Sequence, residues 1–282
     1  MNILSIQSWV AYGHVGNTSA VFPLQRLGAE VWAVNTVQFS NHTGYGDWTG
    51  DVFTGAQVRR LIDGIAARGA LARCDAVLSG YMGDAGIGEA ILDTVRRVKA
   101  GNRRAIYCCD PVIGDDDTHI YVRAGIPELM RNQALPCADI ITPNRFEVEQ
   151  LVGHSCATLE DVKQAIVELQ AIGPRTVLVT SVRTNDTPND ALDMVVGAGE
   201  KFHRLRTPLL PLAVNGAGDA LAALFLFHHL RTGDAAEALS AAGNSIFGLM
   251  RRTAEAESRE ILTVAAQEEF VAPTERFPAI PC

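Results

Sequence analysis

The sequence has no long apolar segment, because its longest uninterrupted apolar run, Ala220–Phe227, ends after eight residues at two histidines. A membrane-spanning helix needs roughly 20 such residues, so none is expected. Basic residues are also in the minority: 24 Lys and Arg stand against 32 Asp and Glu, a formal net charge of −8. This balance argues against nucleic acid or an anionic membrane as a partner. The first residues lack the basic and apolar regions of a signal peptide, which predicts a cytoplasmic protein.

Cysteine is sparse as well, and several catalytic motifs are missing. The six cysteines show no C-x-x-C spacing, so we expect reduced core thiols rather than a zinc site or a disulfide framework. The chain has no Gly-Lys dipeptide, no G-x-G-x-x-G after its first apolar run, no G-x-S-x-G and no H-E-x-x-H. These absences argue against a P-loop ATPase, a Rossmann dehydrogenase, a serine hydrolase of the α/β type and a zinc protease.

What the sequence does contain is a regular alternation of short apolar runs and amphipathic stretches, in 282 residues of which 48% are hydrophobic. Such alternation is typical of an α/β fold with a mainly parallel sheet covered by helices. Strands are predicted at 3–7, 31–39, 76–79, 104–110, 140–142, 176–181, 193–196 and 202–206. Helices are predicted at 18–27, 57–68, 89–99, 145–151, 159–171 and 217–231. No repeat or linker divides the chain, so residues 1–282 are predicted to form one domain.

The strongest local motif is Asn215–Asp219, a glycine-rich segment that leads directly into an apolar helix. Glycines let the backbone approach a ligand, and free N–H groups at a helix N-terminus bind anions. Asp219, in the first turn, is suited to accept a proton from a hydroxyl nucleophile. The motif therefore fits a phosphoryl-transfer site. By itself it also fits an ordinary glycine-rich helix entry in which Asp219 favours the helix dipole.

Acidic residues follow two further predicted strands. Asp110 lies at the carboxyl end of a strand, the edge where open α/β sheets bind their ligands. Asp110, Asp115 and Glu147 have the chemistry to contact magnesium, which prefers one or two carboxylates beside substrate phosphates. Asn144 and Glu147 also fit a capping box at a helix start. A turn at Asp110, an acidic surface loop and a simple helix cap therefore remain open as alternatives.

Two other segments are open to more than one interpretation. Residues 40–55 form a glycine-rich and aromatic stretch that is too long for a simple turn and is typical of functional loops. Within it, Tyr45 and Trp48 either cover a site or form a subunit contact. Thr180 and Ser181 end an apolar strand, where they either touch a nucleotide phosphate or only close the strand.

Taken together, these motifs resemble those of the pyridoxal kinases, the vitamin B6 salvage kinases of the ribokinase-like superfamily. The resemblance covers nearly the whole chain and rests on Ser5–Ser8 with Tyr12–Asn17, Asn35–Tyr45, Leu78–Tyr81, Cys109–Val112, Ile141–Asn144 with Glu147, and Gly216–Asp219. It implies a ribokinase-like three-layer sandwich with a mainly parallel central sheet, and a homodimer. It also implies ATP-dependent phosphorylation of the 5′-hydroxymethyl group of pyridoxal, and of pyridoxine and pyridoxamine.

The same resemblance implies roles for individual residues. Asp219 is implied as the general base, with the backbone N–H groups of Gly216, Ala217 and Gly218 stabilising the phosphoryl oxygens. The pyridine pocket is implied to involve Ser8, Val15, Thr43, Gly44, Tyr81, Tyr121 and Asp219. The nucleotide side is implied to involve Asp110, Thr142, Asn144, Glu147, Thr180, Ser181, Thr207, Pro208 and Leu209. Magnesium is assigned to Asp110, Asp115 and Glu147, and a monovalent cation such as K⁺ to Thr142 and Thr180.

Three segments depart from the family pattern. Trp9 stands where many relatives have a histidine, and residues 210–215 are shorter and more apolar than the family's adenine lid. Asp115–Asp117 resembles a shortened flap ahead of Tyr121. Two other functions are kept beside the first: a hydroxymethylpyrimidine kinase, which shares the anion-site design, and a non-catalytic pyridoxal-binding protein.

Overall fold

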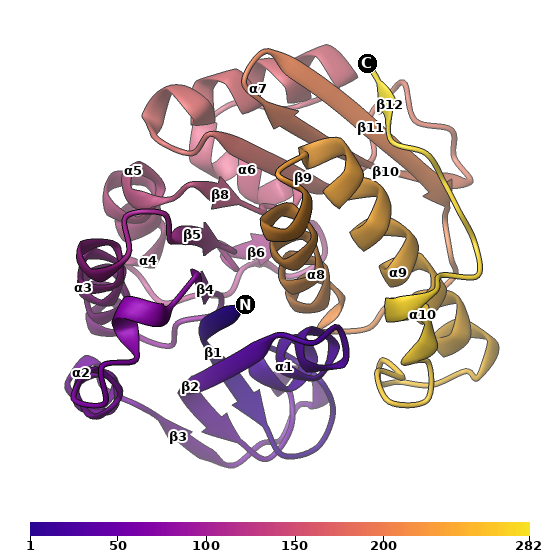
Figure 1. Ribbon diagram of the computed structural model, residues 1–282. Helices are drawn as coiled ribbons and strands as arrows, with labels where there is room; N and C mark the ends of the chain where they lie inside the picture. Colours follow the sequence, from indigo (N-terminus) through magenta and orange to yellow (C-terminus); the bar gives the residue numbers. More distant parts are fainter.

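The computed structural model describes residues 1–282, and its middle layer is a ten-stranded sheet (Figure 1). Across the sheet the order is β12 (Ile280–Pro281), β11 (Lys201–Pro208), β10 (Ala191–Ala198), β9 (Thr176–Val182), β8 (Ile140–Ile141), β5 (Ile106–Cys109), β4 (Ala76–Ser79), β1 (Asn2–Val10), β2 (Glu30–Phe39) and β3 (Gly50–Val52). The six strands from β9 to β2 are parallel. β3, β10, β11 and β12 pair antiparallel at the two sides, so the expected mainly parallel sheet is confirmed.

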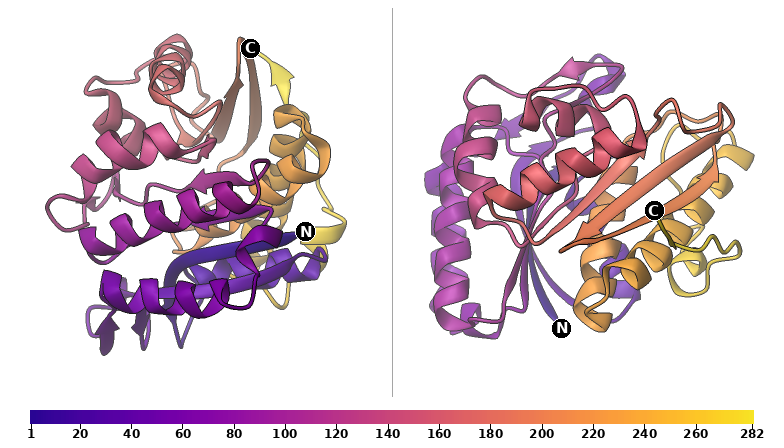
Figure 2. Two further views of the ribbon diagram at one scale, coloured as in Figure 1. Left: turned by 60° about the vertical axis from the view of Figure 1, so that its left-hand side comes forward. Right: turned by 90° about the horizontal axis from the view of Figure 1, so that it is seen from above.

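Helices cover both faces of the sheet and give the three-layer sandwich that the sequence predicts (Figures 1 and 2). One core lies under α2 (Gly55–Ala66), α3 (Ala85–Gly101), α6 (Arg145–Val152) and α7 (Leu159–Ile172). The other lies under α1 (Asn17–Arg26), α8 (Ala217–Thr232) and α9 (Ala235–Glu255). Neighbouring strand residues face opposite cores because side chains alternate along a strand. Cys109 accordingly faces the first core and Cys108 the second, and all six cysteines are free thiols, as expected.

Helix boundaries follow local capping. Thr158 caps α7 in a capping box with Asp161, and Gly173 follows its last residue. α3 begins at Ala85, four residues before the predicted start, because the Asp84 side chain accepts a hydrogen bond from the Gly86 backbone N–H. The predicted strand 104–110 is shorter, since only Ile106–Cys109 pairs with its neighbours. The sequence interpretation also missed the 21-residue helix α9 entirely.

Short elements connect this frame. They are η1 (Thr43–Tyr45), η2 (Leu71–Arg73), α4 (Ile126–Leu129), η3 (Met130–Ala134), α5 (Leu135–Cys137) and α10 (Glu268–Val271). A separate two-stranded hairpin is formed by β6 (Gly114–Asp115) and β7 (His119–Ile120). This hairpin corresponds to the expected short flap ahead of Tyr121.

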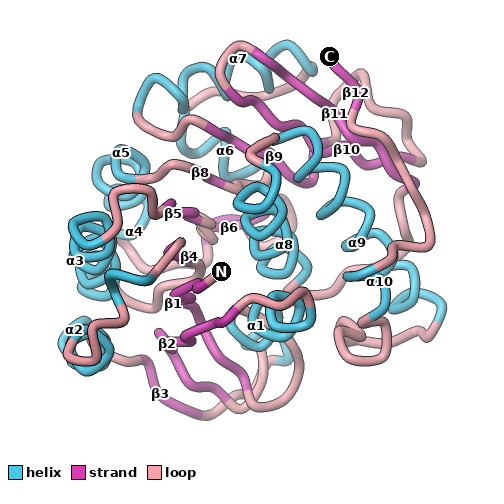
Figure 3. Tube along the Cα trace, in the orientation of Figure 1, coloured by secondary structure: helices cyan, strands magenta, loops and turns pink.

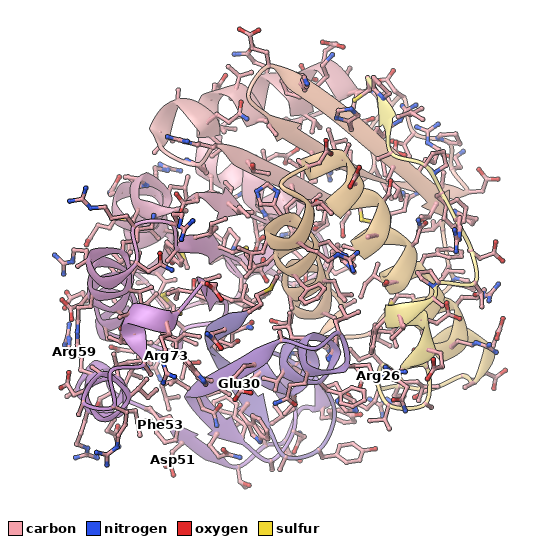
Figure 4. All side chains as sticks on the ribbon, viewed as in Figure 1. Arg26, Glu30, Asp51, Phe53, Arg59 and Arg73 are labelled. Carbon is pink, nitrogen blue, oxygen red and sulfur yellow. The ribbon has the colours of Figure 1, made fainter.

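The chain after α9 returns along the molecule as a long connection through α10 to β12 (Figure 3). Arg26 of α1, labelled in Figure 4, donates hydrogen bonds to Glu268 at 2.9 Å and to Gln267 at 3.2 Å. The C-terminal segment is thereby fastened to the N-terminal half of the chain. None of the helices is long and apolar enough to span a membrane.

The carboxyl ends of the parallel strands meet at one edge of the sheet. β10 runs antiparallel to β9 and β11 antiparallel to β10, so the end of β11 also lies at that edge. The start of α8 and the loops after β1, β4, β5 and β8 lie there as well. Open α/β sheets bind ligands at this edge, and most of the predicted site residues follow these strands.

Candidate active site

The glycine motif at the start of α8 is tied to the loop between β1 and α1. Gly216 has φ +86°, and a Cβ atom there would lie 1.9 Å from the carbonyl oxygen of His14, so only glycine fits. The Ser19 hydroxyl donates a 2.6 Å hydrogen bond to the Gly216 carbonyl. The first backbone N–H groups of α8 have no acceptor within the helix, and the space for a Cβ atom on Gly218 is open, a setting in which an anion can approach the helix N-terminus.

Asp219 lies in the first turn of α8, as the sequence predicts. Burial raises the pKa of its carboxyl to about 6, because a charged group is disfavoured away from water. Hydrogen bonding from the backbone N–H groups of Gly16 and of Asp219 itself acts in the opposite direction. A carboxylate with a pKa near neutrality is well matched to accept a proton at physiological pH.

Asp110 and Thr142 follow the neighbouring strands β5 and β8. The Thr142 hydroxyl donates a 2.9 Å hydrogen bond to the Asp110 carboxylate, and both residues are buried. Burial raises the pKa of Asp110 well above its usual range, and the carboxylates of Glu147 and Asp219 raise it further. The Thr142 hydrogen bond opposes this rise only in part. Glu147 and Asp219 are thus close enough to Asp110 to repel its carboxylate.

Glu147 is held rigidly beside them at the start of α6. Its Oε1 atom accepts hydrogen bonds from the N–H groups of Ile113 at 2.6 Å and Gly114 at 3.4 Å, and its Oε2 atom accepts one from Asn144 at 2.9 Å. Burial nevertheless raises the pKa of Glu147 to about 7. Val112 adopts φ +46°, a conformation rare for a β-branched residue, immediately before the two donors. The predicted capping box of Asn144 and Glu147 is confirmed, and it also anchors the loop after β5.

The β6–β7 hairpin brings Asp115 and Tyr121 near the Glu147 carboxylate. The Oδ1 atom of Asp115 accepts hydrogen bonds within its own turn, from the backbone N–H groups of Asp117 and Thr118 and from the Thr118 hydroxyl. Partial burial and the carboxylates of Glu147, Asp219, Asp110 and Asp115 raise the pKa of the Tyr121 hydroxyl. Tyr121 is 46% exposed, so it lies between these carboxylates and the solvent or beside them at the protein surface.

The carboxylates at this edge of the sheet have the chemistry of a magnesium site that substrate phosphates complete. No three His, Cys, Asp or Glu side chains converge closely enough to enclose a metal alone. Two buried carboxylates with raised pKa values, Asp110 and Glu147, fit an ion that keeps several waters and is completed by substrate phosphates. Because three backbone N–H groups already occupy the Glu147 carboxylate, Asp110 is the more available of the two.

Apart from Tyr121 and Asp219, the predicted pyridine-pocket residues lie in β1, in the β1–α1 loop, in η1 and directly after β4. Val15 is buried in a small apolar cluster with Val10, Val37 and Phe39, and Tyr81 packs against this cluster. Ser8 is also buried, and a Cβ atom on Gly16 would lie 2.3 Å from its hydroxyl. Thr43 and Gly44 lie in the exposed η1 turn. A Cβ atom on Gly44 would stand 3.7 Å from the side-chain nitrogen of Asn215, so this turn reaches the glycine motif.

The predicted nucleotide residues divide into two groups. Thr180 continues the sheet, because its N–H donates a 2.9 Å hydrogen bond to Pro143 and it bridges to Asn144. Ser181 next to it is exposed, with φ +51°. Thr207, Pro208 and Leu209 lie two strands away at the end of β11; Thr207 is buried, while the other two are exposed.

Sequence reasoning missed Glu260, which lies in the connection after α9. Its carboxylate accepts hydrogen bonds from the Tyr45 hydroxyl and from the His14 N–H. These contacts span 215 and 246 residues of sequence, and no local motif marks a residue that acts at such a distance.

Comparison with known proteins places this arrangement in a family. A family model described as phosphomethylpyrimidine kinase matches residues 55–262. The chain is 63% identical over 286 residues to the pyridoxal kinase PdxY of Granulibacter bethesdensis, with 100% of both chains covered. It is 53% identical over 279 residues to pyridoxal kinase PdxY of Rubrobacter xylanophilus, covering 99% of this chain and 96% of the relative.

Solved structures agree with these relatives. Pyridoxal kinase from Leishmania donovani in complex with ADP and ginkgotoxin superimposes with a TM-score of 0.94 at 29% identity, covering 100% of this chain and 99% of that one. Its complex with ADP and pyridoxine gives 0.93 at 28% identity with the same coverage. The resemblance read from the sequence motifs is thus confirmed, and the chain belongs to the phosphomethylpyrimidine kinase family and, within it, to the pyridoxal kinases.

Proposed function

We propose that this protein transfers the γ-phosphoryl group of ATP to the 5′-hydroxymethyl group of pyridoxal, and of pyridoxine and pyridoxamine, giving the 5′-phosphate and ADP. The observation that carries the proposal is the placement of Asp219 within the electrostatic reach of Asp110 and Tyr121, at the glycine-rich start of α8. A proton acceptor, an anion site and an acidic pair suited to a metal–nucleotide complex are therefore combined at one sheet edge.

The reaction follows from these positions. Asp219 accepts the proton of the hydroxymethyl group as the substrate oxygen forms its bond to the γ-phosphorus. The bond between that phosphorus and the oxygen bridging to the β-phosphate breaks, and the electron pair leaves with ADP. The pyridine ring lies in the pocket of Ser8, Val15 and Tyr81, with Thr43, Gly44 and Tyr121 at its mouth, which orients the hydroxymethyl group toward Asp219.

Charge that builds up on the phosphoryl oxygens is stabilised by the backbone N–H groups of Gly216, Ala217 and Gly218. These donors are fixed before the substrate arrives, so they need no reorganisation during the reaction. The Gly216 contact with His14 and the Ser19 hydrogen bond hold them in place. On the nucleotide side we assign phosphate contacts to Thr142, Asn144, Thr180 and Ser181, and adenine contacts to Thr207, Pro208 and Leu209.

We assign Mg²⁺ to Asp110 and Glu147, with Asp115 beside them, and a monovalent cation such as K⁺ to Thr142 and Thr180. When bound, Mg²⁺ neutralises charge on the ATP phosphates. The residues themselves supply the preorganised acidic setting: Thr142 orients Asp110, and the backbone N–H groups of Ile113 and Asn144 orient Glu147.

Three broader assignments accompany this function. Residues 1–282 are proposed to form a single kinase domain, because one sheet contains both the first strand and the last. A homodimer is proposed from the family resemblance. A cytoplasmic location is proposed because the reaction consumes ATP.

The test is ATP-dependent formation of pyridoxal 5′-phosphate by the purified protein, with and without magnesium. Hydroxymethylpyrimidine serves as the comparison substrate, since the matching family model is described as phosphomethylpyrimidine kinase. Magnesium-dependent product from pyridoxal supports the proposal. Selective turnover of the pyrimidine would change the substrate, and pyridoxal binding without product would indicate a binding protein.

A further inference from the structure

One carboxylate joins two loops that are distant in the sequence. The Tyr45 hydroxyl donates a 2.6 Å hydrogen bond to Oε1 of Glu260, and the His14 backbone N–H donates a 3.1 Å hydrogen bond to Oε2. Tyr45 is the last residue of η1, directly after Thr43 and Gly44. His14 directly precedes Val15. One oxygen of Glu260 therefore holds η1 and the other holds the β1–α1 loop, and both segments contribute residues to the proposed pyridine pocket, called the vitamer pocket below.

The surroundings of Glu260 are shaped for this contact. Gly13 has φ +90°, and a Cβ atom there would lie 2.3 Å from Oε2 of Glu260, so the loop approaches the carboxylate as closely as glycine allows. The Arg259 guanidinium lies 4.7 Å from the centre of the Tyr45 ring, a cation–π arrangement on the same side chain. The Ser258 hydroxyl donates a 2.6 Å hydrogen bond to the Glu260 carbonyl and so fixes the turn that presents Glu260.

The same segment also reaches the phosphoryl-transfer motif. The Thr263 hydroxyl lies 3.2 Å from Nδ1 of His14, whose carbonyl oxygen in turn contacts Gly216. The Cδ1 atom of Ile261 lies 3.3 Å from the position of a Cβ atom on Gly216. Residues 260–263 therefore contact three segments: η1 through Tyr45, the β1–α1 loop through His14, and the glycine motif of α8 at Gly216.

We propose that Glu260 is a positioning residue that holds the vitamer pocket closed and in register with the glycine motif of α8. This inference rests on the proposed function, because it concerns the pocket for the phosphoryl acceptor. Glu260 touches neither nucleotide residues nor the Asp110–Glu147 pair, so its effect falls on the pyridoxal side of the reaction.

The contact acts on exposed loops rather than on the cores. Thr43 and Gly44 are exposed, and no residue of η1 is buried. Without this contact such a turn samples many conformations. The entropy lost when the turn becomes ordered then weakens substrate binding. A charge-assisted hydrogen bond to Tyr45 removes this cost before pyridoxal arrives.

The experiment compares Glu260→Ala, Glu260→Gln, Tyr45→Phe and Tyr12→Phe in the full chain. Tyr12 is the matched control. Its ring packs edge-on against the Tyr45 ring, with 6.1 Å between the ring centres, but its hydroxyl does not bond to Glu260. Pyridoxal dissociation constants are measured by calorimetry without ATP, and kcat and KM are measured for both substrates. Thermal unfolding of every variant is recorded.

Glu260→Ala is expected to weaken pyridoxal binding and raise its KM by about tenfold, as expected for losing a hydrogen bond to a charged group. The KM for ATP should stay within about twofold of the wild-type value, because the nucleotide side keeps all its contacts. Tyr45→Phe, which removes only one oxygen atom, should show the same selectivity to a smaller extent. Glu260→Gln should fall between Ala and wild type, and Tyr12→Phe should match wild type.

Unchanged pyridoxal binding in both Tyr45→Phe and Glu260→Ala would overturn the inference. So would equal rises in the KM values of both substrates together with a lowered unfolding temperature, because that pattern describes a general structural role. If Glu260→Ala does not fold, Tyr45→Phe against Tyr12→Phe still decides the question. A wild-type protein that binds pyridoxal without phosphorylating it would refute the proposed function, whereas the binding measurements would still test Glu260.

Discussion

The Thr142 hydroxyl donates a 2.9 Å hydrogen bond to the buried Asp110 carboxylate, which links the ends of two neighbouring parallel strands. Cys109 of β5 is paired with Ile141 of β8, so the residue after each strand end meets its counterpart directly. A carboxylate so placed is oriented but poorly solvated. Its pKa is raised by burial, by Glu147 and by Asp219, so the metal-free protein holds Asp110 in an unfavourable setting when it is ionised.

Replacing Asp110 should therefore separate stability from activity. A group whose pKa is higher in the folded than in the unfolded state contributes stability at low pH that is lost as the pH rises through the folded-state pKa. Asp110→Asn removes this loss, so we expect the metal-free variant to unfold at least about 3 °C above wild type at pH 8. At a pH below the ordinary Asp range the difference should vanish. Magnesium-dependent turnover should fall strongly at every pH.

Thermal unfolding of the metal-free protein across this pH range, combined with rates at several magnesium concentrations, checks both parts. Asp117→Asn is the control, because it removes an exposed carboxylate of the neighbouring hairpin. It should change neither stability nor magnesium dependence. An Asp110→Asn variant less stable than wild type at pH 8 would mean that Asp110 is stabilised by ionisation, against the argument from burial.

Asp219 should control turnover rather than substrate binding. General base catalysis typically contributes about 10²–10⁴-fold, so Asp219→Asn should lower kcat by that range while pyridoxal still binds. Burial raises the pKa of Asp219 to about 6. The acceptor must be unprotonated, so kcat/KM of the wild-type protein should fall about tenfold per pH unit below that value.

A pH–rate profile and pyridoxal calorimetry on the variant are the measurements. Turnover by Asp219→Asn within about tenfold of wild type lies below the usual contribution of a general base and would remove the assignment. A wild-type kcat/KM that stays flat down to pH 5 would contradict the role of an ionised Asp219 in the free enzyme.

Two capping boxes of the same kind offer a matched pair. Asn144 caps α6 with Glu147, and Thr158 caps α7 with Asp161. Asn144→Ala and Thr158→Ala should each lower the free energy of unfolding by about 1 kcal/mol. Only Asn144→Ala should also raise the KM for ATP, because Asn144 holds Glu147 and donates a 2.8 Å hydrogen bond to the Gly114 carbonyl. Chemical unfolding and ATP kinetics on both variants check this. If both variants changed the KM for ATP equally, Asn144 would act only as a helix cap.

This pair also shows which features the sequence could predict. Capping boxes lie within four consecutive residues, and the alternation of strands and helices recurs along the chain, so both are visible locally. The site residues Asp110, Asn144, Glu147 and Asp219 could be named because each follows a strand end or starts a helix. The raised pKa values of Asp110, Glu147 and Asp219 could not be named in this way, because they depend first on burial, which only the folded chain has.

The features that the sequence did not reveal depend on distant contacts. Helix α9 was missed because much of its buried face consists of Ala and Gly rather than large apolar residues. Gly243 lets the helix pack against Leu205 and Met194 of the antiparallel strands, which a sequence pattern does not display. Glu260 was missed for the same reason, since its partners Tyr45 and His14 meet it only in the folded protein.

The glycines of the α8 motif provide a last prediction, because they differ in what a methyl group would meet. At Gly216, alanine would have to adopt φ +86° and place Cβ 1.9 Å from the His14 carbonyl oxygen. Gly216→Ala should therefore lower the free energy of unfolding by more than about 1 kcal/mol. At Gly218 an added Cβ atom would meet no atom within 4 Å apart from its own helix backbone and chain neighbours, and φ is not left-handed, so alanine fits the ligand-free fold. Gly218→Ala should leave stability unchanged or raise it by up to about 1 kcal/mol, since alanine favours the helix.

Turnover should nevertheless fall in Gly218→Ala, because the added methyl group occupies the space that the proposed phosphoryl oxygens need to reach the backbone N–H groups. Chemical unfolding and kcat, measured on both variants, distinguish the two causes of lost activity. In Gly216→Ala stability and activity fall together, whereas in Gly218→Ala only activity falls. A Gly218→Ala variant with wild-type kcat would mean that no phosphate approaches this helix end closely, and the anion site would have to be sought elsewhere along the sheet edge.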